Sequence, residues 1–447
     1  MRSILLFLCL VAAVSIQAQQ AISIEPMLEA RSSHQLAKID DTKALAAGGW
    51  NGTEISASAE YYDVETEMWL EVAPMGTART NFAMCDLNNG YVIAAGGWDG
   101  EDPASLASTE IYDFDNDTWM AGPDLTVGRS YVESTKLLDG RILFTGGFDG
   151  NNTMATCDIY DPVVNTITAA APMNFARNSH ATVLLPDGRV LVAGGFNPSL
   201  DFQMDEAEIY DPFLDEWTVT GSLNVGRDNM EGVVNDSGIC AIVGGRVFNG
   251  NENLFEGLAS AEIYEPFNGT WITVSLPQKH CYNHMLQFGN GAIYSVSGTD
   301  QTGDGVTTTY APSMSFSLGI STTVETIDAA EDGDQRFRSA SAQLSPDMWI
   351  VAGADDAGNG TAELWMEPSA VEDITAPSVI AFPNPCVDRF VISGNGNYFW
   401  QMIDMNGRIA LEGQGNVVDV TTLPAGNYQL TSTDNENPFR LSVQVIH

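Results

Sequence analysis

The sequence predicts an all-β protein whose larger part is a seven-bladed β-propeller. A unit of about 50 residues recurs along the chain with only strand and turn signals inside it, which is typical of propellers. Each clear unit contains an arginine that is followed 17 residues later by a glycine pair. The clear copies of this arginine are Arg31, Arg79, Arg129, Arg177 and Arg227. A sixth copy has decayed to His280 and a seventh to Arg336 or Arg338, which brings the count of blades to seven.

The unit that begins at Arg177 shows the strands in order. Residues 178–185 and 190–193 are apolar-rich runs separated by Pro186-Asp187-Gly188. Asp-Gly suits a tight hairpin, because both central positions of such a turn need positive φ. Residues 208–211 give a third strand, and a polar turn leads to a fourth strand at Trp217. Four antiparallel strands make one blade of a propeller.

The last unit lacks a fourth strand, and the N-terminal segment can supply it. Residues 363–365 are the predicted third strand of the seventh unit, and no fourth strand follows them. Residues 21–26 lie just before Met27, at the spacing that a fourth strand has in the other units. We therefore expect the N-terminal strand to complete the seventh blade, which would remove an exposed sheet edge.

The fourth unit carries the fullest set of motifs. They are Ala176-Arg177-Asn178-Ser179-His180, Leu185-Pro186-Asp187-Gly188-Arg189, Gly194-Gly195, and Glu208-Ile209-Tyr210-Asp211-Pro212 with Trp217. These runs resemble the kelch repeat family, and the resemblance covers residues 21–369. It implies a kelch-type propeller. The repeated Arg, Gly, Tyr and Trp are interpreted as mainly architectural, because one of each kind per blade is what a repeat needs.

The C-terminal segment predicts a second, small all-β domain. Short alternating runs are separated by Asn-Gly and Pro-Ala-Gly turns. Phe382-Pro383-Asn384-Pro385 and Leu423-Pro424-Ala425-Gly426-Asn427-Tyr428 resemble the C-terminal sorting domain of the bacterial type IX secretion system, over residues 379–447, with 370–378 as a linker. The resemblance implies an immunoglobulin-like β-sandwich and the secretion machinery as a partner. The alternative is an ordinary adhesive immunoglobulin-like domain.

The N-terminus predicts export. Arg2 precedes an apolar run at 4–16, and Ala18 is a suitable cleavage point, so residues 1–18 are the predicted signal peptide. The run is too short to span a membrane, and no transmembrane segment is expected later in the chain. Cys9 follows a leucine where lipidation would need a small residue. The expected location is secreted or cell-surface, across both membranes of a bacterium.

Charge and cysteine content limit the partners. With 59 acidic and 18 basic residues the net charge is −41, which repels nucleic acid and anionic membranes, so neither is an expected partner. The extreme charge is interpreted as a solubility feature of an exported protein. The five cysteines beyond the signal peptide lie on different units without a repeating position, so no disulfide framework is predicted. They are Cys85, Cys157, Cys240, Cys281 and Cys386.

Length variation between the early units falls in the loop after the glycine pair. The distance from the first glycine to the repeated tyrosine ranges from 14 to 20 residues, while the arginine-to-glycine spacing stays constant. Variable loops on a rigid scaffold usually carry recognition. In kelch proteins, the residues that open these loops and those just past each repeated arginine line the mouth of the central channel. The resemblance therefore implies a ring made of Trp50, Trp98, Phe148, Phe196, Arg246, Ser32, Asn81, Tyr131, Asn178, Asp228 and Tyr282.

This ring predicts a non-catalytic module that binds an extracellular protein or a glycan. Aromatic faces stack on sugar rings or apolar side chains, and amides and guanidiniums hydrogen-bond to polar groups. The alternative for the aromatics is packing against neighbouring loops. The alternative function is an extracellular carbohydrate-active enzyme on a propeller scaffold: a mutarotase, a hydrolase or a galactose-oxidase-like oxidase.

No catalytic residue, metal site or cofactor is predicted. Copper oxidase chemistry needs a Tyr–Cys crosslink with Tyr and His ligands, and the clustered candidates are not arranged in that way. These candidates are His280, Cys281, Tyr282 and His284. Calcium is an alternative at Asp113, Asp115 and Asp117, or at Asp300 and Asp304. The first run lacks the glycine of a calcium loop and coincides with the turn before Trp119, which favours a structural interpretation.

Overall fold

Strands make up the regular secondary structure of the part of the chain that the structure describes. The computed structural model describes residues 21–101, 105–199, 202–235, 238–250, 254–266, 268–289, 291–299, 313–318, 323–326, 338–355, 358–366, 381–382, 389–392, 399–404, 408–414, 417–432 and 440–445. The chain divides into two compact units, Met1–Glu367 and Pro368–His447. The predicted signal peptide and linker lie outside the described residues.

The first unit holds seven sheets, each with four antiparallel blade strands, as the sequence predicted. The first three are β2 (Gln35–Asp40), β3 (Lys43–Ala47), β4 (Ala59–Asp63) and β5 (Met68–Val72); β6 (Ala83–Asn88), β7 (Tyr91–Ala95), β8 (Thr109–Asp113) and β9 (Thr118–Ala121); and β10 (Glu133–Lys136), β11 (Ile142–Thr145), β12 (Cys157–Asp161) and β13 (Thr166–Ala170). The fourth and fifth are β14 (Ala181–Leu184), β15 (Val190–Ala193), β18 (Ala207–Asp211) and β19 (Glu216–Val219); and β20 (Glu231–Val234), β21 (Cys240–Val243), β23 (Leu254–Glu265) and β24 (Thr270–His280). The last two are β25 (His284–Gln287), β26 (Ile293–Val296), β27 (Met314–Ser317) and β28 (Thr323–Thr326); and β29 (Ala340–Ser345), β30 (Met348–Ala354), β31 (Gly360–Met366) and β1 (Ala21–Ile24).

Extra strands extend the loops that follow the glycine pairs. In the fourth blade, β16 (Phe196–Asn197) and β17 (Phe202–Gln203) form a small hairpin. In the fifth blade, β22 (Arg246–Asn249) pairs with the long β23. The loops that vary in length in the sequence are therefore built out as ordered hairpins on two blades.

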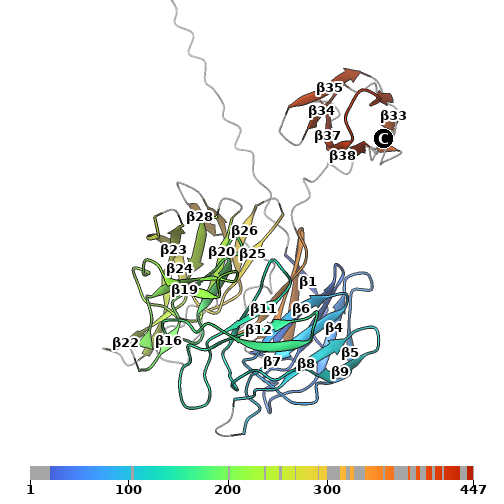
Figure 1. Cartoon of the computed structure of the whole chain (residues 1–447). Coiled ribbons are helices and arrows are strands. Elements are labelled where there is room, and N and C mark those ends of the chain that lie inside the picture. The colour runs from blue at the N-terminus through green and yellow to red at the C-terminus, as the bar shows by residue number, and fades with distance from the viewer. Residues whose placement is uncertain are drawn as a thin grey trace, which may run out of the picture. The chain divides into compact units, whose positions relative to one another are not determined.

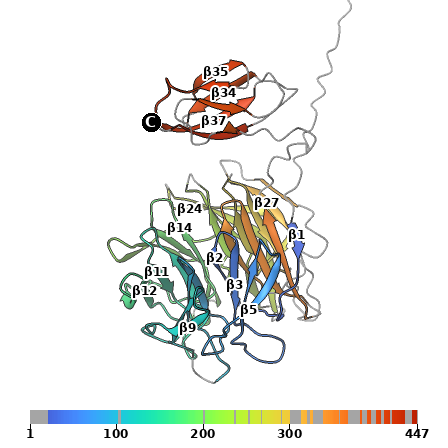
Figure 2. The same cartoon turned by 90° about the vertical axis from the view of Figure 1, so that its right-hand side faces the viewer.

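The inner strands of the blades form a closed ring. β2 contacts β6, and the series continues through β10, β14, β20, β25 and β29 back to β2. The blades follow one another in chain order, as the colours of Figure 1 show. Closure depends on β1, which pairs antiparallel with β31 from Ala21↔Trp365 to Ile24↔Ala362. The N-terminal strand thus occupies the outer position of the seventh blade, where Figure 2 shows β1 against the orange strands.

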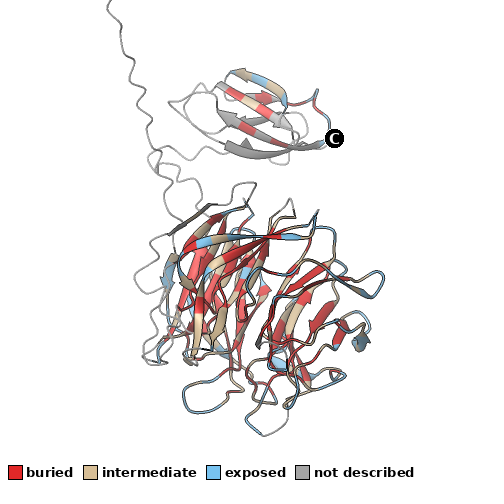
Figure 3. Cartoon of the chain, turned by 90° about the vertical axis from the view of Figure 1, so that its left-hand side faces the viewer, coloured by how far each residue is buried: buried red, intermediate tan, exposed pale blue. Residues whose placement is uncertain are grey.

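Buried apolar residues lie in the strands, and exposed residues gather in the turns (Figure 3). The repeated tyrosine and tryptophan join neighbouring blades. In the second blade, the rings of Tyr112 and Trp119 lie 5.1 Å apart, and the Trp119 indole N–H donates to the Ala73 carbonyl at 2.9 Å, just past the outer strand of the first blade. The same indole bond recurs at Trp69, Trp217 and Trp271. These residues therefore fix one blade against the next.

The repeated arginine is buried and bonds to groups of its own blade. Arg177 donates to the carbonyls of Gly194 at 2.6 Å and Glu206 at 2.8 Å, and to Oε1 of Glu208 at 3.0 Å. Oε2 of Glu208 accepts the Asn174 N–H at 2.7 Å, so the pair also fixes the incoming loop. The equivalent ion pairs in the other early blades are Arg31–Glu60, Arg79–Glu110, Arg129–Asp158 and Arg227–Glu262.

The second unit contains two small sheets, which agree with the predicted small β domain. One consists of β32 (Ala381–Phe382), β33 (Arg389–Ile392) and β36 (Val417–Asp419), and the other of β34 (Phe399–Asp404), β35 (Ile409–Gln414), β37 (Gly426–Ser432) and β38 (Arg440–Val445). The turn before β37 is held by the Tyr428 hydroxyl, which donates to the Pro424 carbonyl at 2.9 Å. Residues 383–388, which include Pro383-Asn384-Pro385, lie outside the described residues. Within the described ranges, no helix is long and apolar enough to cross a membrane.

Candidate functional site at the channel mouth

One residue of each blade sits at the same place around the central channel, two positions past the repeated arginine. All seven have left-handed backbone conformations, with φ between 48° and 56°. They are Ser33, Asn81, Tyr131, Ser179, Asn229, Tyr282 and Arg338. Non-glycine residues seldom adopt this conformation, and they persist in it only where surrounding structure holds them. Arg338 occupies this position in the seventh blade. The seventh copy of the repeated arginine is therefore the residue two positions earlier, 336, which lies outside the described residues.

Hydrogen bonds between blades hold these residues in place. The N–H of one donates to the carbonyl of its equivalent in the preceding blade, for instance Tyr131 to Asn81 at 2.8 Å and Asn229 to Ser179 at 3.0 Å. The first and last blades are joined in the same way, because the Ser33 N–H donates to the Arg338 carbonyl at 2.9 Å. We call the seven residues the mouth ring. It is a rigid backbone frame whose side chains are not dictated by the repeat.

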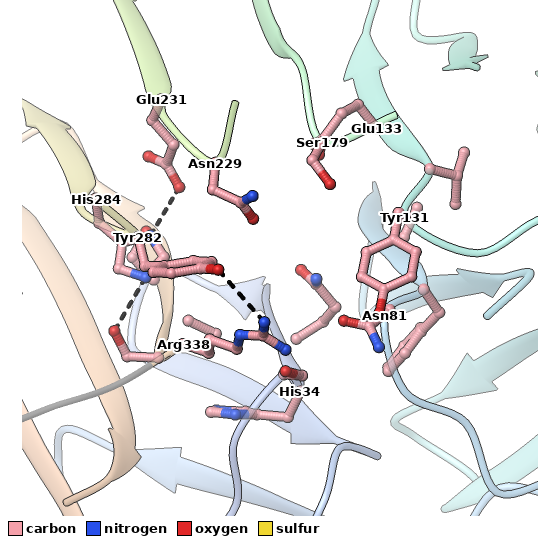
Figure 4. Close-up of a pocket in the computed structure, with 18 of the residues that line it drawn as sticks. His34, Asn81, Tyr131, Glu133, Ser179, Asn229, Glu231, Tyr282, His284 and Arg338 are labelled. Atoms are coloured by element: carbon pink, nitrogen blue, oxygen red, sulfur yellow. Dashed lines mark hydrogen bonds and ion pairs between the residues drawn. The ribbon is translucent and has the colours of Figure 1, made fainter. Parts of the chain in front are cut away.

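The mouth ring surrounds a cavity of about 250 Å³. Its members supply hydroxyls, amides, two phenol rings and one guanidinium, as the close-up in Figure 4 shows. Residues one and two positions further along the chain also line it, among them Glu133, Glu231, His284 and Ser339. The cavity is therefore polar and carries charges of both signs.

Glu231 and His284 form the best-defined polar contact in this wall. Oε1 of Glu231 lies 2.7 Å from Nδ1 of His284 (Figure 4). Oε2 of Glu231 accepts the Met285 N–H at 2.9 Å. Nε2 of His284 lies 3.1 Å from Oγ of Ser339. The three side chains come from the fifth, sixth and seventh blades and join these neighbouring blades along the channel wall.

Glu133 lies across the same cavity on the third blade. Burial within the channel, and to a smaller degree the nearby charge of Glu231, raises the pKa of Glu133 to about 8. Its carboxyl is therefore largely protonated at neutral pH and can donate a hydrogen bond. Two carboxyls in one cavity thus have different roles, since Glu231 is paired with His284.

Arg338 stacks on Tyr282 at the mouth. The guanidinium carbon lies 5.0 Å from the centre of the ring, and Nη2 lies 3.4 Å from the tyrosine hydroxyl. Arg246 approaches the same ring at 5.4 Å and stacks on Phe255 at 4.2 Å. Cations over aromatic faces are held electrostatically, so these contacts fix both guanidiniums against the aromatic rings of the mouth.

His34 and His180 line the cavity as neutral imidazoles. Burial is the main cause that holds the pKa of each well below its usual value, and a neighbouring arginine adds to the effect. Nε2 of His180 lies 2.8 Å from the Thr145 hydroxyl. Neither ring nitrogen of His34 has a hydrogen-bond partner among the residues that the structure describes.

The residues that the sequence analysis placed on one ring divide into two tiers. Asn81, Tyr131 and Tyr282 belong to the mouth ring. Ser32, Asn178 and Asp228 lie one residue earlier and do not line the cavity. Each forms a β-bridge to the residue that opens the loop of its own blade, in the pairs Ser32↔Trp50, Asn178↔Phe196 and Asp228↔Arg246.

Asn178 and Asp228 therefore do not line the cavity, and ligand binding at these two positions stays a prediction. Asp228 is fully buried and holds Arg246 at 2.6 Å and the Gln203 amide at 3.0 Å. The sequence analysis missed Ser33, Ser179, Asn229 and Arg338. A uniform count of two residues past each repeated arginine would have found them, since the backbone conformation recurs at that position.

The loop-opening aromatics form an outer tier. Trp50, Trp98, Phe148 and Phe196 do not line the cavity. Trp50 and Trp98 are 45% and 40% exposed, whereas Phe148 and Phe196 are half-buried. Arg246 is half-buried and ion-paired. Ligand binding at these positions stays a prediction.

The metal candidates from the sequence are engaged in other contacts. Nε2 of His280 bonds the Ser297 carbonyl, and Sγ of Cys281 lies 3.3 Å from the Thr299 carbonyl. Asp113 accepts from the Asn116 amide at 2.8 Å, and Asp117 accepts from the Ala73 N–H at 2.8 Å. In the described ranges no three His, Cys, Asp or Glu side chains converge on one point. Asp300 and Asp304 lie outside them.

Cys85, Cys157 and Cys240 are free thiols. Burial raises the pKa of Cys85, Cys157 and Cys240 to about 12, which makes these thiols unreactive at neutral pH. Cys386 lies outside the described residues.

Comparisons with known proteins agree with the architecture. A family model for the kelch motif matches residues 39–76 and 80–126. No curated protein matches the chain. The structure of YjhT covers 68% of this chain and 99% of its own, at 13% identity and a TM-score of 0.53. A fungal alcohol oxidase of the AA5 family, in complex with copper, covers 96% of this chain and 100% of its own, at 16% identity and a TM-score of 0.63. At these identities the likeness shows the fold alone.

Proposed function

We propose that this seven-bladed β-propeller with kelch motifs is an exported or cell-surface module that recognises a protein or carbohydrate ligand at its channel mouth. The observation that carries the proposal is the mouth ring. Its backbone has the same conformation in all seven blades, but its side chains include two serines, two asparagines, two tyrosines and an arginine. The buried arginines and tyrosines of the early blades are uniform because the fold needs them. The ring side chains vary between blades, which supports a role in specificity.

The chemistry of the ring suits a polar ligand with flat or hydroxyl-rich parts. Tyr131 and Tyr282 offer ring faces for stacking, and Asn81 and Asn229 offer both donors and acceptors. Arg338 adds a cation that forms bidentate contacts with carboxylates. The half-exposed Trp50 and Trp98 would extend the contact to a larger ligand.

A glycan array and a peptide array with the purified full chain test this proposal. We expect a ligand whose affinity falls at least about tenfold in the double variant Asn81→Ala/Tyr131→Ala, because a few central contacts carry most of the binding energy. Phe213→Ala is the control, since Phe213 is 93% exposed and lies in the turn after β18. Equal affinity in the ring variant and the control would contradict recognition at the mouth.

Export and sorting form the second part of the proposal. The apolar run at 4–16 supports a signal peptide, and the motif at 423–428 supports a sorting domain that engages the type IX machinery. Removal of residues 379–447 should leave the propeller folded in the periplasm. Appearance of the truncated chain on the cell surface or in the medium at the normal level would refute the sorting role.

The alternative is an extracellular carbohydrate-active enzyme. The likeness to a copper-containing AA5 oxidase favours testing it. The described side chains do not fit that group, because His280 and Cys281 use their donor atoms inside the sixth blade. Metal analysis of the purified chain by mass spectrometry, with a peroxide assay on alcohols and sugars, distinguishes the two functions. Stoichiometric copper with oxidation of an alcohol would favour the enzyme.

A further inference from the structure

We propose that Ser339 is a nucleophile in the channel mouth, with His284 as its general base, in an acyl-transfer site for small acyl esters. The proposal concerns a covalent activity and does not depend on the ligand recognition proposed above. It rests on one contact chain that crosses three blades, from Glu231 through His284 to Ser339.

The contact chain has the connectivity of a nucleophile, a base and an orienting carboxylate. Glu231 contacts Nδ1 of His284 at 2.7 Å, and Nε2 of the same ring contacts Oγ of Ser339 at 3.1 Å. The Met285 N–H fixes the second carboxylate oxygen at 2.9 Å. The Glu231–His284 and His284–Ser339 distances are both within the reach that proton transfer between side chains requires.

The partners of His284 fix its tautomer. An ionised carboxylate only accepts hydrogen bonds, so Nδ1 carries the proton of the neutral ring. Nε2 is then a lone-pair acceptor, and the Ser339 hydroxyl must donate to it. The serine proton therefore already points at the atom that would remove it, which is the arrangement of an activated serine.

The repeat does not require this contact chain. The residue four positions past the repeated arginine is Glu231 in the fifth blade and His284 in the sixth, but Gln35, Ala83 and Ala181 in the first, second and fourth. The sixth blade also offers an internal contrast. Ser295 lies 3.3 Å from Nδ1 of His280, but that ring bonds a carbonyl rather than a carboxylate, and neither residue lines the cavity.

The cavity provides access and positive charge. Ser339, His284 and Glu231 all line the space of about 250 Å³, which has room for a small acyl group. Ser339 is only 8% exposed, so a substrate must enter the mouth to reach it. Arg338 lines the same cavity, where its cation would offset the negative charge on the carbonyl oxygen in the transition state.

The reaction needs only the ester and water as reactants. Oγ of Ser339 bonds to the acyl carbon while its proton passes to Nε2 of His284, and the carbonyl electron pair moves to oxygen. The tetrahedral intermediate collapses as the C–O bond to the alcohol breaks, and the departing alkoxide takes the proton from Nε2. Water then attacks the acyl-serine by the same proton transfers, which releases the carboxylic acid and restores Ser339. Glu231 acts as a positioning residue for the ring throughout.

A fluorophosphonate probe and 4-nitrophenyl acetate test the proposal on the full chain. We expect the probe to label wild-type protein, with the adduct on Ser339 identified by peptide mass spectrometry. Ser339→Ala and His284→Ala should each lower kcat for the ester by about 100-fold. Glu231→Gln should lower kcat about tenfold while KM is unchanged, because it disturbs the base and not substrate binding.

Ser295→Ala is the matched control, since it removes another buried serine that contacts a histidine. It should lower stability without changing labelling or hydrolysis. An absence of any Ser339 adduct on folded wild-type protein would overturn the proposal, and this measurement needs no variant. Hydrolysis by Ser339→Ala within about twofold of wild type would overturn it as well. The contact chain would then only tie the three blades together.

Discussion

In the fourth blade Arg177 and Glu208 form a buried ion pair, whereas in the sixth blade the same two positions hold His280 and Met314. The strand registers show this equivalence, because Glu208 lies opposite Val192 in one sheet and Met314 lies opposite Ser295 in the other. Met314 is fully buried, and Nε2 of His280 bonds the Ser297 carbonyl. The sixth blade has therefore lost the cation and the anion together.

The difference follows from the energetics of buried charge. Either partner alone would be an uncompensated ion in a dry sheet, which costs far more than the pair contributes. The sixth blade instead takes part in a polar contact at the channel, where His284 joins Glu231 of the fifth blade to Ser339 of the seventh. Four experiments follow from this comparison, beginning with the largest expected effect on stability.

The largest effect is expected from breaking a pair in a regular blade. Arg177→Met removes a fully buried cation and leaves Glu208, which is also fully buried, without its partner. The expected loss in the free energy of unfolding is about 3–5 kcal/mol. Urea denaturation followed by tryptophan fluorescence measures it.

The matched control for this variant is Arg189→Met. Arg189 also pairs with a carboxylate, that of Asp187 at 2.7 Å, but the two side chains are 42% and 52% exposed. An exposed pair contributes about 0–1 kcal/mol. Similar losses in the two variants would contradict the structural role assigned to the repeated arginine.

A double-mutant cycle in the sixth blade sharpens the comparison. His280→Arg alone should destabilise by about 2–4 kcal/mol, because the new cation is buried beside Met314 rather than a carboxylate. His280→Arg with Met314→Glu rebuilds the pair of the early blades. We expect the double variant to recover at least about 1 kcal/mol relative to the sum of the single changes. Additive losses would mean that the sixth blade differs in backbone as well as in side chains.

The sequence was sufficient to predict the architecture because the side chains that recur in each unit are those that the propeller fold needs. Spacing alone located Arg177 and its equivalents, the glycine pairs and the missing strand that β1 supplies. Each of these features depends on local backbone geometry and on one partner residue at a fixed spacing along the sequence. Such features recur in every blade and are visible in a single chain.

The site was predicted only in part, because its residues lie on a spatial ring rather than in a local motif. Asn81, Tyr131 and Tyr282 line the cavity, whereas Asn178 and Asp228 lie one position earlier and pair with the loop-opening residues, so ligand binding at all five stays a prediction. The contact between His284 and Ser339 joins residues 55 positions apart on different blades. No local sequence pattern predicts such a contact, which becomes visible only when the blades are arranged in the closed propeller.

The channel carboxyls give a pH-dependent prediction. The pKa of Glu133 is raised from 4.5 to about 8 by folding. Between these two pH values the folded protein keeps the Glu133 proton, whereas the unfolded chain has lost it. The stability that Glu133 contributes is therefore present below about pH 4.5 and is lost as the pH rises through 8. Glu133→Gln should raise the Tm at pH 9 relative to wild type, by about 2 °C more than at pH 5. Glu54→Gln, at an exposed position, should show no such difference.

A small effect on stability is expected at the outer tier of the regular blades. Trp50 and Trp98 open the loops of the first and second blades, where the sixth blade has Thr299. Because they are 45% and 40% exposed, Trp50→Ala with Trp98→Ala should cost about 1–2 kcal/mol in total. Trp365→Ala, at a position 1% exposed, should cost about 3–5 kcal/mol by itself and serves as the comparison. If the outer tier binds ligand, the paired variant should lose affinity for the array-identified ligand at least about tenfold while it stays folded. A loss of stability equal to that of the Trp365 variant, with affinity unchanged, would show that the two tryptophans only pack the loops.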